Sequence, residues 1–504
     1  MDYSQFGAML PELIILGLFL IVFLFDVFGG ERSRGIITPL TTVLFGVATV
    51  AIWLIPSSEA AVFGGMYVDD TACKAMKAIL NVGVFIVFLQ SAKWVESDEV
   101  AIRKGEFYEL ILVTLFGMYL MISARHFLLF IIGLESASLP LAALVAFNKR
   151  HYESHEAAIK YILTAVFSSA ILMMGLSFVY AFSGGSLYFD DICAMVTGDA
   201  PSGLLITALA FVIAGIGFKL SLVPFHLWTA DVYQGAPTAI TSYLSVISKG
   251  SAAFAFFVIF VDAFGPLYSG LWEWMMYAVI IATITVGNLF AIRQKNMKRF
   301  MAFSSVSQAG YIMLGVMTEE SLGLASMMFY IFVYVVSNLA VFSVISAIEN
   351  KTGKLSMDDY DGLHKTNPWL SFAMTLAMFS LAGIPPFAGF FSKILIFNSV
   401  TASNSMALYM LVLIALINTI ISLYYYLLVV KAIWLKPGEA KVEAFRSDNS
   451  ERVALWLCVA GIVFFGLVPC IYDYCVNAAA SSTLFAESNA MEVLIKTILV
   501  NVVN

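Results

Sequence analysis

The sequence contains few charged residues. Asp, Glu, Lys and Arg make up 12% of its 504 residues, while hydrophobic residues make up 61%. An average soluble domain has about 25% charged residues. The composition therefore excludes an ordinary soluble domain and indicates an all-α polytopic membrane protein, one that crosses the membrane many times.

A basic surface and clustered cysteines are also missing. The net charge is −7, and no basic stripe is present, so we expect no nucleic-acid partner. The cysteines are five in number and scattered, without CxxC or Cys/His ligand spacing: Cys73, Cys193, Cys458, Cys470 and Cys475. We therefore expect no metal or iron–sulfur site in this chain.

Long apolar runs occupy most of the chain instead. A helical crossing of a bilayer needs about 20 apolar residues. Continuous runs of this length favour helices over barrel strands, because a helix satisfies its own backbone hydrogen bonds in lipid. About 14 transmembrane helices are predicted, near residues 8–28, 36–55, 72–91, 107–123, 127–147, 157–182, 203–223, 237–261, 271–292, 300–317, 322–348, 369–400, 406–434 and 452–476.

Two of these runs are interrupted. The seventh ends at Pro224, and the twelfth contains Pro385 and Pro386, which break a helix. Because the interruptions are five crossings apart, two blocks of five helices would lie inverted in the membrane. We predict helices 1–3 in 1–106, a first repeat of helices 4–8 in 107–262, an inverted repeat of helices 9–13 in 263–435, and helix 14 with the C-terminal tail in 436–504.

The loop charges predict an orientation. Alternate loops hold 18 of the 27 Lys and Arg residues, and the loops between them hold mostly acids. The positive-inside rule places the basic loops in the cytoplasm. An even number of crossings then puts both termini on the outer, periplasmic side.

Four ionisable residues lie well inside apolar runs: Glu135, Lys219, Lys249 and Lys393. A charge at that depth costs about 2.5–3.5 kcal/mol even on the mildest scale. Lys249 lies about twelve residues from either end of its run, which is about 18 Å from water at about 1.5 Å per residue. Its side chain cannot span that distance, so snorkelling does not explain it and we predict a functional role.

Lysine suits proton transfer in such a place. Burial lowers the pKa of a lysine side chain towards neutrality, and a nearby carboxylate raises it again, whereas arginine stays protonated. We interpret the three lysines as a lateral proton wire, with Glu135 as the functional partner of Lys219. His226 is more readily explained as a packing or water-lining group than as a metal ligand, and it is a candidate relay. Further groups could fill the gaps: Ser221, Ser245 and Ser248.

Charged residues near the ends of the runs have simpler explanations. Glu12 and Asp26 lie near the ends of the first run and are expected at the membrane interface. Lys77, near the start of a helix, and Arg125, in a loop, are among the few cations of the outer side. None of these four is a candidate site residue.

Several segments resemble a known family. Residues 218–228 (FKLSLVPFHLW), 231–237 (DVYQGAP), 296–305 (NMKRFMAFSS) and 381–386 (LAGIPP) are similar to subunit N of bacterial NADH-quinone oxidoreductase, or respiratory complex I. The antiporter-like membrane subunits to which subunit N belongs also include subunits of cation/proton antiporters and membrane hydrogenases. The loop 232–238 and a lysine at position 393, where subunit M has a glutamate, point to subunit N.

The resemblance implies a proton-translocating subunit of a translocase in the bacterial inner membrane. It implies that Glu135 and Lys219 form a charge pair, that Lys249 carries the central proton, and that Lys393 passes it outside. NADH, FMN, the iron–sulfur clusters and the quinone would be handled by other subunits. The partners would be antiporter-like and small membrane subunits and, indirectly, the peripheral redox arm. Gln308 stands where the family often has His, and glutamine carries no proton at neutral pH.

Two alternatives stay open at this point. A subunit of a multisubunit Na+(K+)/H+ antiporter, or of a related membrane hydrogenase or dehydrogenase, would use the same fold and charges. A scaffold subunit would use the charges only to hold helices together. Against the scaffold stands the cost of burying Lys249 with no acid nearby in the sequence.

Overall fold

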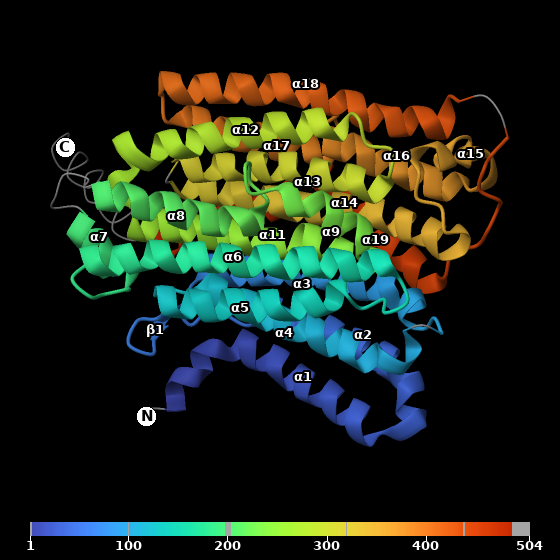
Figure 1. The fold of residues 1–504 in the computed structure, drawn as a ribbon, viewed down its shortest axis with the longest axis horizontal. Helices are drawn as coiled ribbons and strands as arrows, with labels where there is room; N and C mark the ends of the chain where they lie inside the picture. The colour runs from blue at the N-terminus through green and yellow to red at the C-terminus, as the bar shows by residue number, and fades with distance from the viewer. Residues whose placement is uncertain (1–2, 99, 197–202, 319, 437–438, 486–504) are drawn as a thin grey trace, which may run out of the picture.

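The bundle consists of helices that run side by side, as the computed structural model shows for residues 3–98, 100–196, 203–318, 320–436 and 439–485. The chain advances from α1 at one edge of the bundle to α18 at the other (Figure 1). The sheet content of these residues is one antiparallel hairpin of β1 (Ala60–Val62) and β2 (Tyr67–Asp69). The expected all-α architecture is therefore confirmed.

The first half of the bundle contains the elements up to η4. They are η1 (Tyr3–Met9), α1 (Leu10–Phe28), α2 (Gly30–Leu54), α3 (Thr71–Val95), η2 (Ala101–Arg103), α4 (Lys104–Ser123), α5 (Phe127–Val145), α6 (Tyr152–Phe182), α7 (Phe189–Val196), α8 (Gly203–Leu220), α9 (Leu227–Gly235), α10 (Thr238–Tyr243), the π-helix η3 (Leu244–Ser248), α11 (Lys249–Val258) and η4 (Ile259–Ala263).

The second half contains the remaining elements. They are η5 (Gly265–Leu267), η6 (Tyr268–Trp272), α12 (Glu273–Ala291), α13 (Met297–Met313), η7 (Leu314–Thr318), α14 (Ser321–Thr352), η8 (Met357–Tyr360), α15 (Leu363–Thr366), α16 (Pro368–Ala382), α17 (Ala388–Ala402), α18 (Met406–Trp434), α19 (Asn449–Leu467), α20 (Cys470–Ala480) and η9 (Thr483–Phe485). Of the C-terminal segment 436–504, residues 437–438 and 486–504 lie outside the described part of the chain.

Thirteen helical stretches in the described residues are long and apolar enough to cross a membrane. The helices α16 and α17, of 15 residues each, are too short to do so separately. Together they form the predicted twelfth crossing. The expected fourteen crossings thus correspond to thirteen long stretches and one broken pair.

Both predicted breaks are present. Helix α8 ends at Leu220, and residues 221–226, with Pro224 among them, separate it from α9. Ser221 in this gap has a φ of 61°, a left-handed conformation that is uncommon outside glycine. Helix α16 ends at Ala382, the following Gly383 has a φ of 84°, and α17 begins at Ala388. The two gaps expose backbone polar groups inside the bundle, where side chains can bind them.

Lys249 lies on one of the most enclosed stretches of the chain. In the most apolar stretch of α13–η7 and of α14 every residue is buried, and in α10–η4 the share is 94%. The corresponding share is only 28% in α6 and 33% in α18, so these two helices form part of the outer wall.

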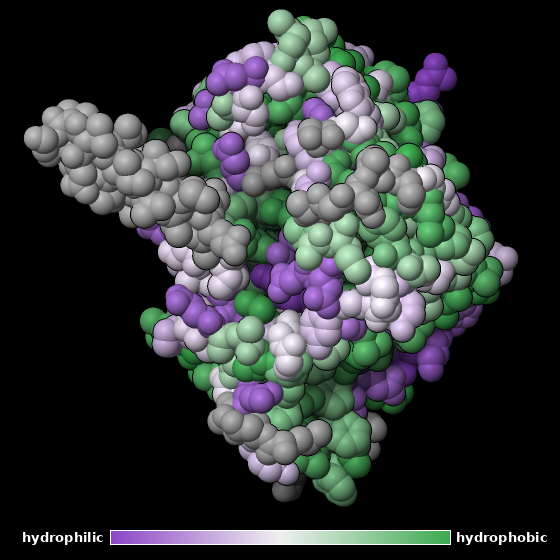
Figure 2. Space-filling view, turned by 90° about the vertical axis from the view of Figure 1, so that its left-hand side faces the viewer, coloured by the Kyte–Doolittle hydropathy of each residue, from purple (hydrophilic) through white to green (hydrophobic). Residues whose placement is uncertain are grey.

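One end of the bundle holds the β-hairpin and α7, at the left of Figure 1. Figure 2 shows that hydrophilic residues gather near the middle of this face. Arg125 follows α4 here, in the loop where it was expected, yet it is only 8% exposed. Its guanidinium lies 3.6 Å from Asp70 and 3.3 Å from Asp262, so it joins three segments of the chain.

Glu12 does not face the membrane interface as the sequence suggested. Its side chain is enclosed by protein and forms an ion pair with Lys77 of α3 at 2.7 Å. The hydroxyl of Tyr67 donates to Glu12 at 2.8 Å and accepts from Lys77 at 3.1 Å. Lys77 lies near the start of α3, as expected, and is fully buried. The correction has a simple cause: the first turn of α1 packs against the hairpin and α3.

Candidate functional site

Lys219 lies in the last turn of α8, directly before the first break. It is 3% exposed, and its Nζ donates to the hydroxyl of Ser138 on α5 at 2.8 Å and to that of Tyr161 on α6 at 3.4 Å. The ammonium is therefore held by neutral hydroxyl groups.

Glu135 lies one helical turn before Ser138 on α5, so the two share a face of that helix. Among the described residues no ion pair within 4.0 Å joins Glu135 to Lys219. The Oε1 atom of Glu135 is buried without a hydrogen-bond partner. The structure thus brings the predicted pair into one neighbourhood, with Ser138 as the residue that contacts the lysine.

His226 lies at the end of the first break, just before α9, and is 6% exposed. Neither ring nitrogen has a hydrogen-bond partner in the described structure, and the nearest recorded aromatic ring is that of Phe290 at 6.4 Å. Buried polar groups are normally hydrogen-bonded, often through water. Among the described residues no cluster of His, Cys, Asp or Glu could hold a metal ion.

Lys249 begins α11 directly after the π-helix η3 and is 2% exposed. Its Nζ donates to the hydroxyl of Ser305 on α13 at 2.6 Å and lies 5.7 Å from the ring centre of Tyr233 on α9. No carboxylate lies within 4.0 Å of it in the described part of the chain. A π-helical turn is frequent at functional sites, because its extra residue turns the following side chain to another face.

Lys393 lies on α17 and reaches back to the end of α16. It is 4% exposed, and its Nζ donates to the carbonyl oxygens of Leu381 and Ala382, both at 3.0 Å. The last carbonyls of a helix have no partner within the helix and carry its partial negative charge, so they favour a cation. Gly383 makes this possible, because a Cβ there would lie 3.0 Å from Cδ of Lys393.

Gln308 connects the surroundings of Lys249 and Lys393. It lies on α13 one turn after Ser305, and its Nε2 donates to the hydroxyl of Tyr426 at 3.1 Å and to the Leu381 carbonyl at 3.5 Å. That carbonyl is the one that Lys393 binds. The sequence marked Gln308 only as a departure from a family pattern, whereas the structure places it one turn from the residue that Lys249 binds and against the carbonyl that Lys393 binds.

A small cavity lies beside this connection. It measures about 10 Å³ and is lined by Gln308, Tyr330, Val333, Tyr334, Ser337, Ser380, Leu381, Gly389, Ser392 and Lys393. A polar cavity of about 10–15 Å³ holds roughly one water molecule. The row from Lys249 to Lys393 therefore contains hydroxyl, amide and carbonyl groups and room for a water.

Aromatic side chains separate Lys219 from Lys249. The ring of Tyr161 lies 5.3 Å from that of Trp228, which lies 6.4 Å from that of Tyr233. The hydroxyl of Tyr233 accepts from Ser305 at 3.4 Å, so it contacts the surroundings of Lys249. The recorded hydrogen bonds do not join the two lysines directly.

The other relay candidates make hydrogen bonds to groups other than the lysines, although Ser221 and Ser248 are close to Lys219 and Lys249 in the sequence. Ser221 accepts a hydrogen bond from Thr229 at 2.7 Å within the break. Ser245 bonds the backbone of Ser242 at 2.8 Å, and the recorded partner of Ser248 is Ser251, through the Ser248 carbonyl at 3.0 Å. All three candidates are buried, yet no recorded hydrogen bond connects them to Lys219, Lys249 or Lys393.

A polar pocket lies at the basic-loop end of the first half. Its volume is about 250 Å³, and it is lined by Glu153, Glu156, Ala157, Lys160, Asp231, Gln234 and Gly235. Asp231 on α9 binds Lys160 at 2.8 Å and Arg299 at 2.6 Å. The pocket lies beside the second half of α9, the helix that His226 directly precedes.

Sequence reasoning missed the pair of Lys77 and Glu12. These side chains are 0% and 1% exposed and lie within 2.7 Å of each other. One acid and one lysine at the edges of separate apolar runs were the available signal. Their contact neutralises Lys77, which distinguishes it from Lys249 and Lys393.

Comparisons with known proteins give consistent results. A family model described as NADH:quinone oxidoreductase/Mrp antiporter, transmembrane, matches residues 124–422. NADH-quinone oxidoreductase subunit N of Phocaeicola vulgatus is 50% identical over 475 residues, covering 94% of this chain and 98% of that protein. The protein of the same name from Nitrosomonas europaea is 34% identical over 476 residues, covering 93% and 97%.

Solved structures share the fold. A chain of respiratory complex I from Thermus thermophilus with bound aureothin superposes with a TM-score of 0.75 at 28% identity, covering 92% of this chain and 98% of that one. A chain of the Mrp complex from Dietzia sp. gives a TM-score of 0.82 at 20% identity, covering 98% and 99%. At that identity the second likeness shows a common fold alone.

Proposed function

The chain belongs to the subunit N family of NADH-quinone oxidoreductases, and we propose that it moves protons across the membrane along Lys219, Lys249 and Lys393. It is a membrane subunit of a bacterial respiratory translocase. Other subunits oxidise NADH, hold the flavin and iron–sulfur clusters and reduce quinone. This chain contributes the proton route, and its partners are neighbouring membrane subunits of the complex.

The main support for this proposal is that two deeply buried ammonium groups are held by neutral oxygen atoms. Lys249 binds a serine hydroxyl, and Lys393 binds two backbone carbonyls. A lysine kept only to fasten helices would be neutralised, as Lys77 is by Glu12. Without a carboxylate partner, the cost of the buried charge falls when the lysine releases its proton.

Glu135 acts on the entry to this route. Its carboxylate lies one turn from Ser138, the residue that Lys219 binds, and it has a free buried oxygen. A small shift of α5 or α8 would bring the carboxylate closer to the ammonium and hold its proton. A shift the other way would release it, so the pair works as a gate.

The route from Lys249 onward uses Ser305, Gln308 and the Leu381 carbonyl. Gln308 positions the chain of hydrogen bonds, and a water molecule in the adjoining cavity carries the proton to Lys393. His226 and the pocket at Asp231 serve the entry from the other end. We place the basic loops in the cytoplasm and both termini outside, as the positive-inside rule requires.

We also infer two inverted repeats around this route. Helices α4 to η4 form one block, and α12 to α18 form the other. Each block contains one broken crossing, formed by α8 and α9 or by α16 and α17, and each break lies beside one functional lysine. Inverted repeats with broken helices at the binding site are the common design of secondary transporters.

An antiporter of sodium or potassium ions is less well supported. The relatives at 34% and 50% identity are named subunit N, while the Mrp complex matches at 20% identity. The scaffold alternative conflicts with the unneutralised charges on Lys249 and Lys393.

The test replaces Gln308 by Leu and by His in the intact complex. Leu removes every hydrogen bond at that position, so NADH-driven proton uptake into inverted membrane vesicles should fall several-fold. His restores a group that can donate, accept and carry a proton, so uptake should be close to the wild-type rate. Uptake is divided by the amount of assembled complex in each preparation.

Gln90 on α3 provides a matched control. It is 1% exposed, accepts from Ser343 at 2.9 Å and binds Ser242, and it contacts none of the three lysines. Gln90→Leu should therefore leave uptake per complex unchanged. Normal uptake in Gln308→Leu, or an equal loss in both Leu variants, would contradict the proposed route.

A further inference from the structure

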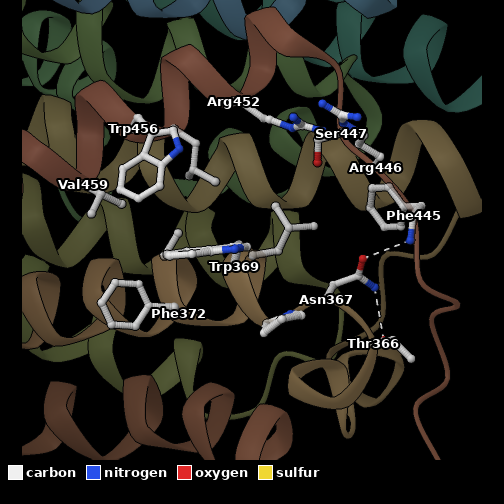
Figure 3. Close-up of a pocket in the computed structure, with 14 residues that line it drawn as sticks. Thr366, Asn367, Trp369, Phe372, Phe445, Arg446, Ser447, Arg452, Trp456 and Val459 are labelled. Carbon is white, nitrogen blue, oxygen red and sulfur yellow. Dashed lines mark hydrogen bonds between the residues drawn. The ribbon is translucent and has the colours of Figure 1, made fainter.

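We propose that an anionic phospholipid binds in a groove between the beginnings of α16 and α19. The groove has a volume of about 390 Å³ and lies at the end of the bundle where the basic loops are. Figure 3 shows an aromatic part and a basic part within it. The lining residues are Thr366, Asn367, Pro368, Trp369, Leu370, Phe372, Ala373, Phe445, Arg446, Ser447, Arg452, Leu455, Trp456 and Val459.

The aromatic part is open to the surroundings of the bundle. Trp369 is 66% exposed, Trp456 is 55% exposed, and their ring centres lie 5.4 Å apart. Phe372, one turn further along α16, is 45% exposed. Tryptophan prefers the level of the lipid headgroups, and the apolar walls below suit an acyl chain.

The basic part contains two arginines without a carboxylate partner. In the described residues no ion pair within 4.0 Å is formed by Arg446 or Arg452. The neighbouring loop cations differ, because Lys436 binds Asp358 at 2.9 Å and Lys441 binds Asp361 at 3.2 Å. The two cations of this region that form no ion pair with the described residues, Arg446 and Arg452, therefore both line the groove, where they complement a phosphate group.

The acids nearest to the arginines are otherwise engaged. Asp448 and Glu451 form the capping box at the start of α19. The side chain of each accepts a hydrogen bond from the backbone N–H of the other. Glu451 also accepts from Asn350 at 3.2 Å. These bonds hold both carboxylates at the helix start and leave the guanidinium groups for another anion.

Hydrogen bonds fix the shape of the groove. The side chain of Asn367 accepts from the backbone of Phe445 at 3.2 Å and donates to the carbonyl of Glu443 at 3.0 Å. The hydroxyl of Thr366 donates to the carbonyl of Val442 at 2.8 Å. The loop before Arg446 is thereby tied to the start of α16, as the dashed lines of Figure 3 show in part. The site is formed before a ligand arrives.

A phospholipid matches both parts at once. A free phosphate ion would use the arginines and leave the aromatic wall unfilled. A zwitterionic lipid would bring its own cation to a place with two arginines that form no ion pair in the described part of the chain. Basic pockets between helices at the cytoplasmic side are suited to anionic headgroups. We therefore assign the groove to a lipid with a net negative headgroup, such as phosphatidylglycerol.

The experiment uses the purified intact complex in detergent and a phosphatidylglycerol probe with a photoreactive diazirine in its acyl chain. After illumination, labelled peptides are mapped by mass spectrometry. We expect label at residues 366–373 and 452–459, displaced by unlabelled phosphatidylglycerol but not by phosphatidylcholine or inorganic phosphate. Arg446→Gln combined with Arg452→Gln should lower this labelling at least fivefold.

The matched control is Lys149→Gln combined with Arg150→Gln, which removes two exposed cations of another basic loop. Labelling of the groove should then stay at the wild-type level. Arg446→Gln alone, at an exposed loop position, serves if the double variant assembles poorly, and should lower labelling at least twofold. Equal labelling in arginine and control variants, or displacement by phosphatidylcholine, overturns the proposal. Label on a neighbouring subunit in place of the groove overturns it too and assigns the groove to a protein interface.

Discussion

Replacing Lys249 by Met distinguishes a lysine that carries protons from one that only holds helices together. Methionine has a similar length and no charge, so it fills the space without a cavity. A buried ammonium group costs about 2.5–3.5 kcal/mol in a membrane, and the substitution removes this cost. It also removes one charge-assisted hydrogen bond to Ser305, worth about 1.5–3 kcal/mol, and a ring contact with Tyr233 worth about 0.5–2 kcal/mol. These effects nearly cancel, and stability should change by less than about 2 kcal/mol.

Lys77→Met in the same chain should behave in the opposite way. Both lysines are almost fully buried, but Lys77 neutralises Glu12 at 2.7 Å. Its loss leaves an unpaired buried carboxylate, which costs about 3–5 kcal/mol. The comparison therefore holds burial and substitution constant and varies only the partner.

The assay measures two quantities on each variant complex. The first is the midpoint of thermal unfolding together with the yield of assembled complex. The second is NADH-driven proton uptake per assembled complex in membrane vesicles. Lys249→Met should assemble and melt like the wild type with proton uptake largely lost, whereas Lys77→Met should lower the midpoint and the yield. The reasoning is refuted if Lys249→Met is as unstable as Lys77→Met, or if it pumps normally.

Three further outcomes follow from single positions. Lys219→Arg keeps the charge but cannot release a proton, so proton uptake per complex should fall strongly, and unchanged uptake would indicate a fixed charge. Gly389→Ala would place a Cβ 1.8 Å from the carbonyl of Ser380, so α16 and α17 must separate and the complex yield should fall; a normal yield would contradict this packing. The hydrogen bond from Lys436 holds the pKa of Asp358 below its ordinary value. This exposed pair should therefore stabilise the folded protein by no more than about 1 kcal/mol. The effect is present above about pH 4 and is lost as the pH falls further. The thermal unfolding midpoints of Asp358→Asn and of the wild type, measured at pH 7 and below pH 4, test this effect. A difference between the two proteins that is equal at both pH values would refute it.

The crossings and their interruptions could be predicted because both depend on neighbouring residues. A run of about 20 apolar residues is long enough to span a bilayer, and Pro224 and Pro386 each remove a backbone donor and disfavour a continuous helix. The prolines alone do not settle the matter, because α2 and α5 continue through Pro39 and Pro140. The structure places breaks at both prolines. The depth of Lys249 also followed from its distance to the ends of its run, and its 2% exposure agrees.

The partners of the charges could not be predicted in the same way. Glu12 meets Lys77, and Gln308 meets the carbonyl of Leu381, across 65 and 73 positions of the chain. Such contacts depend on which helices pack together and how each is rotated. The local sequence around Glu12 suggested an interface position for this reason, and packing against the hairpin and α3 enclosed it instead.

The amino-acid sequence by itself determined how often this protein crosses the membrane and which charges lie in its interior. The energy of an apolar run or a charge in lipid is set mainly by the residues next to it. Only the tertiary structure decided that Lys77 is neutralised, that Lys249 rests on a hydroxyl, and that Lys393 is held by the end of a broken helix. These differences arise where helices from distant parts of the chain bring their side chains and free carbonyls together.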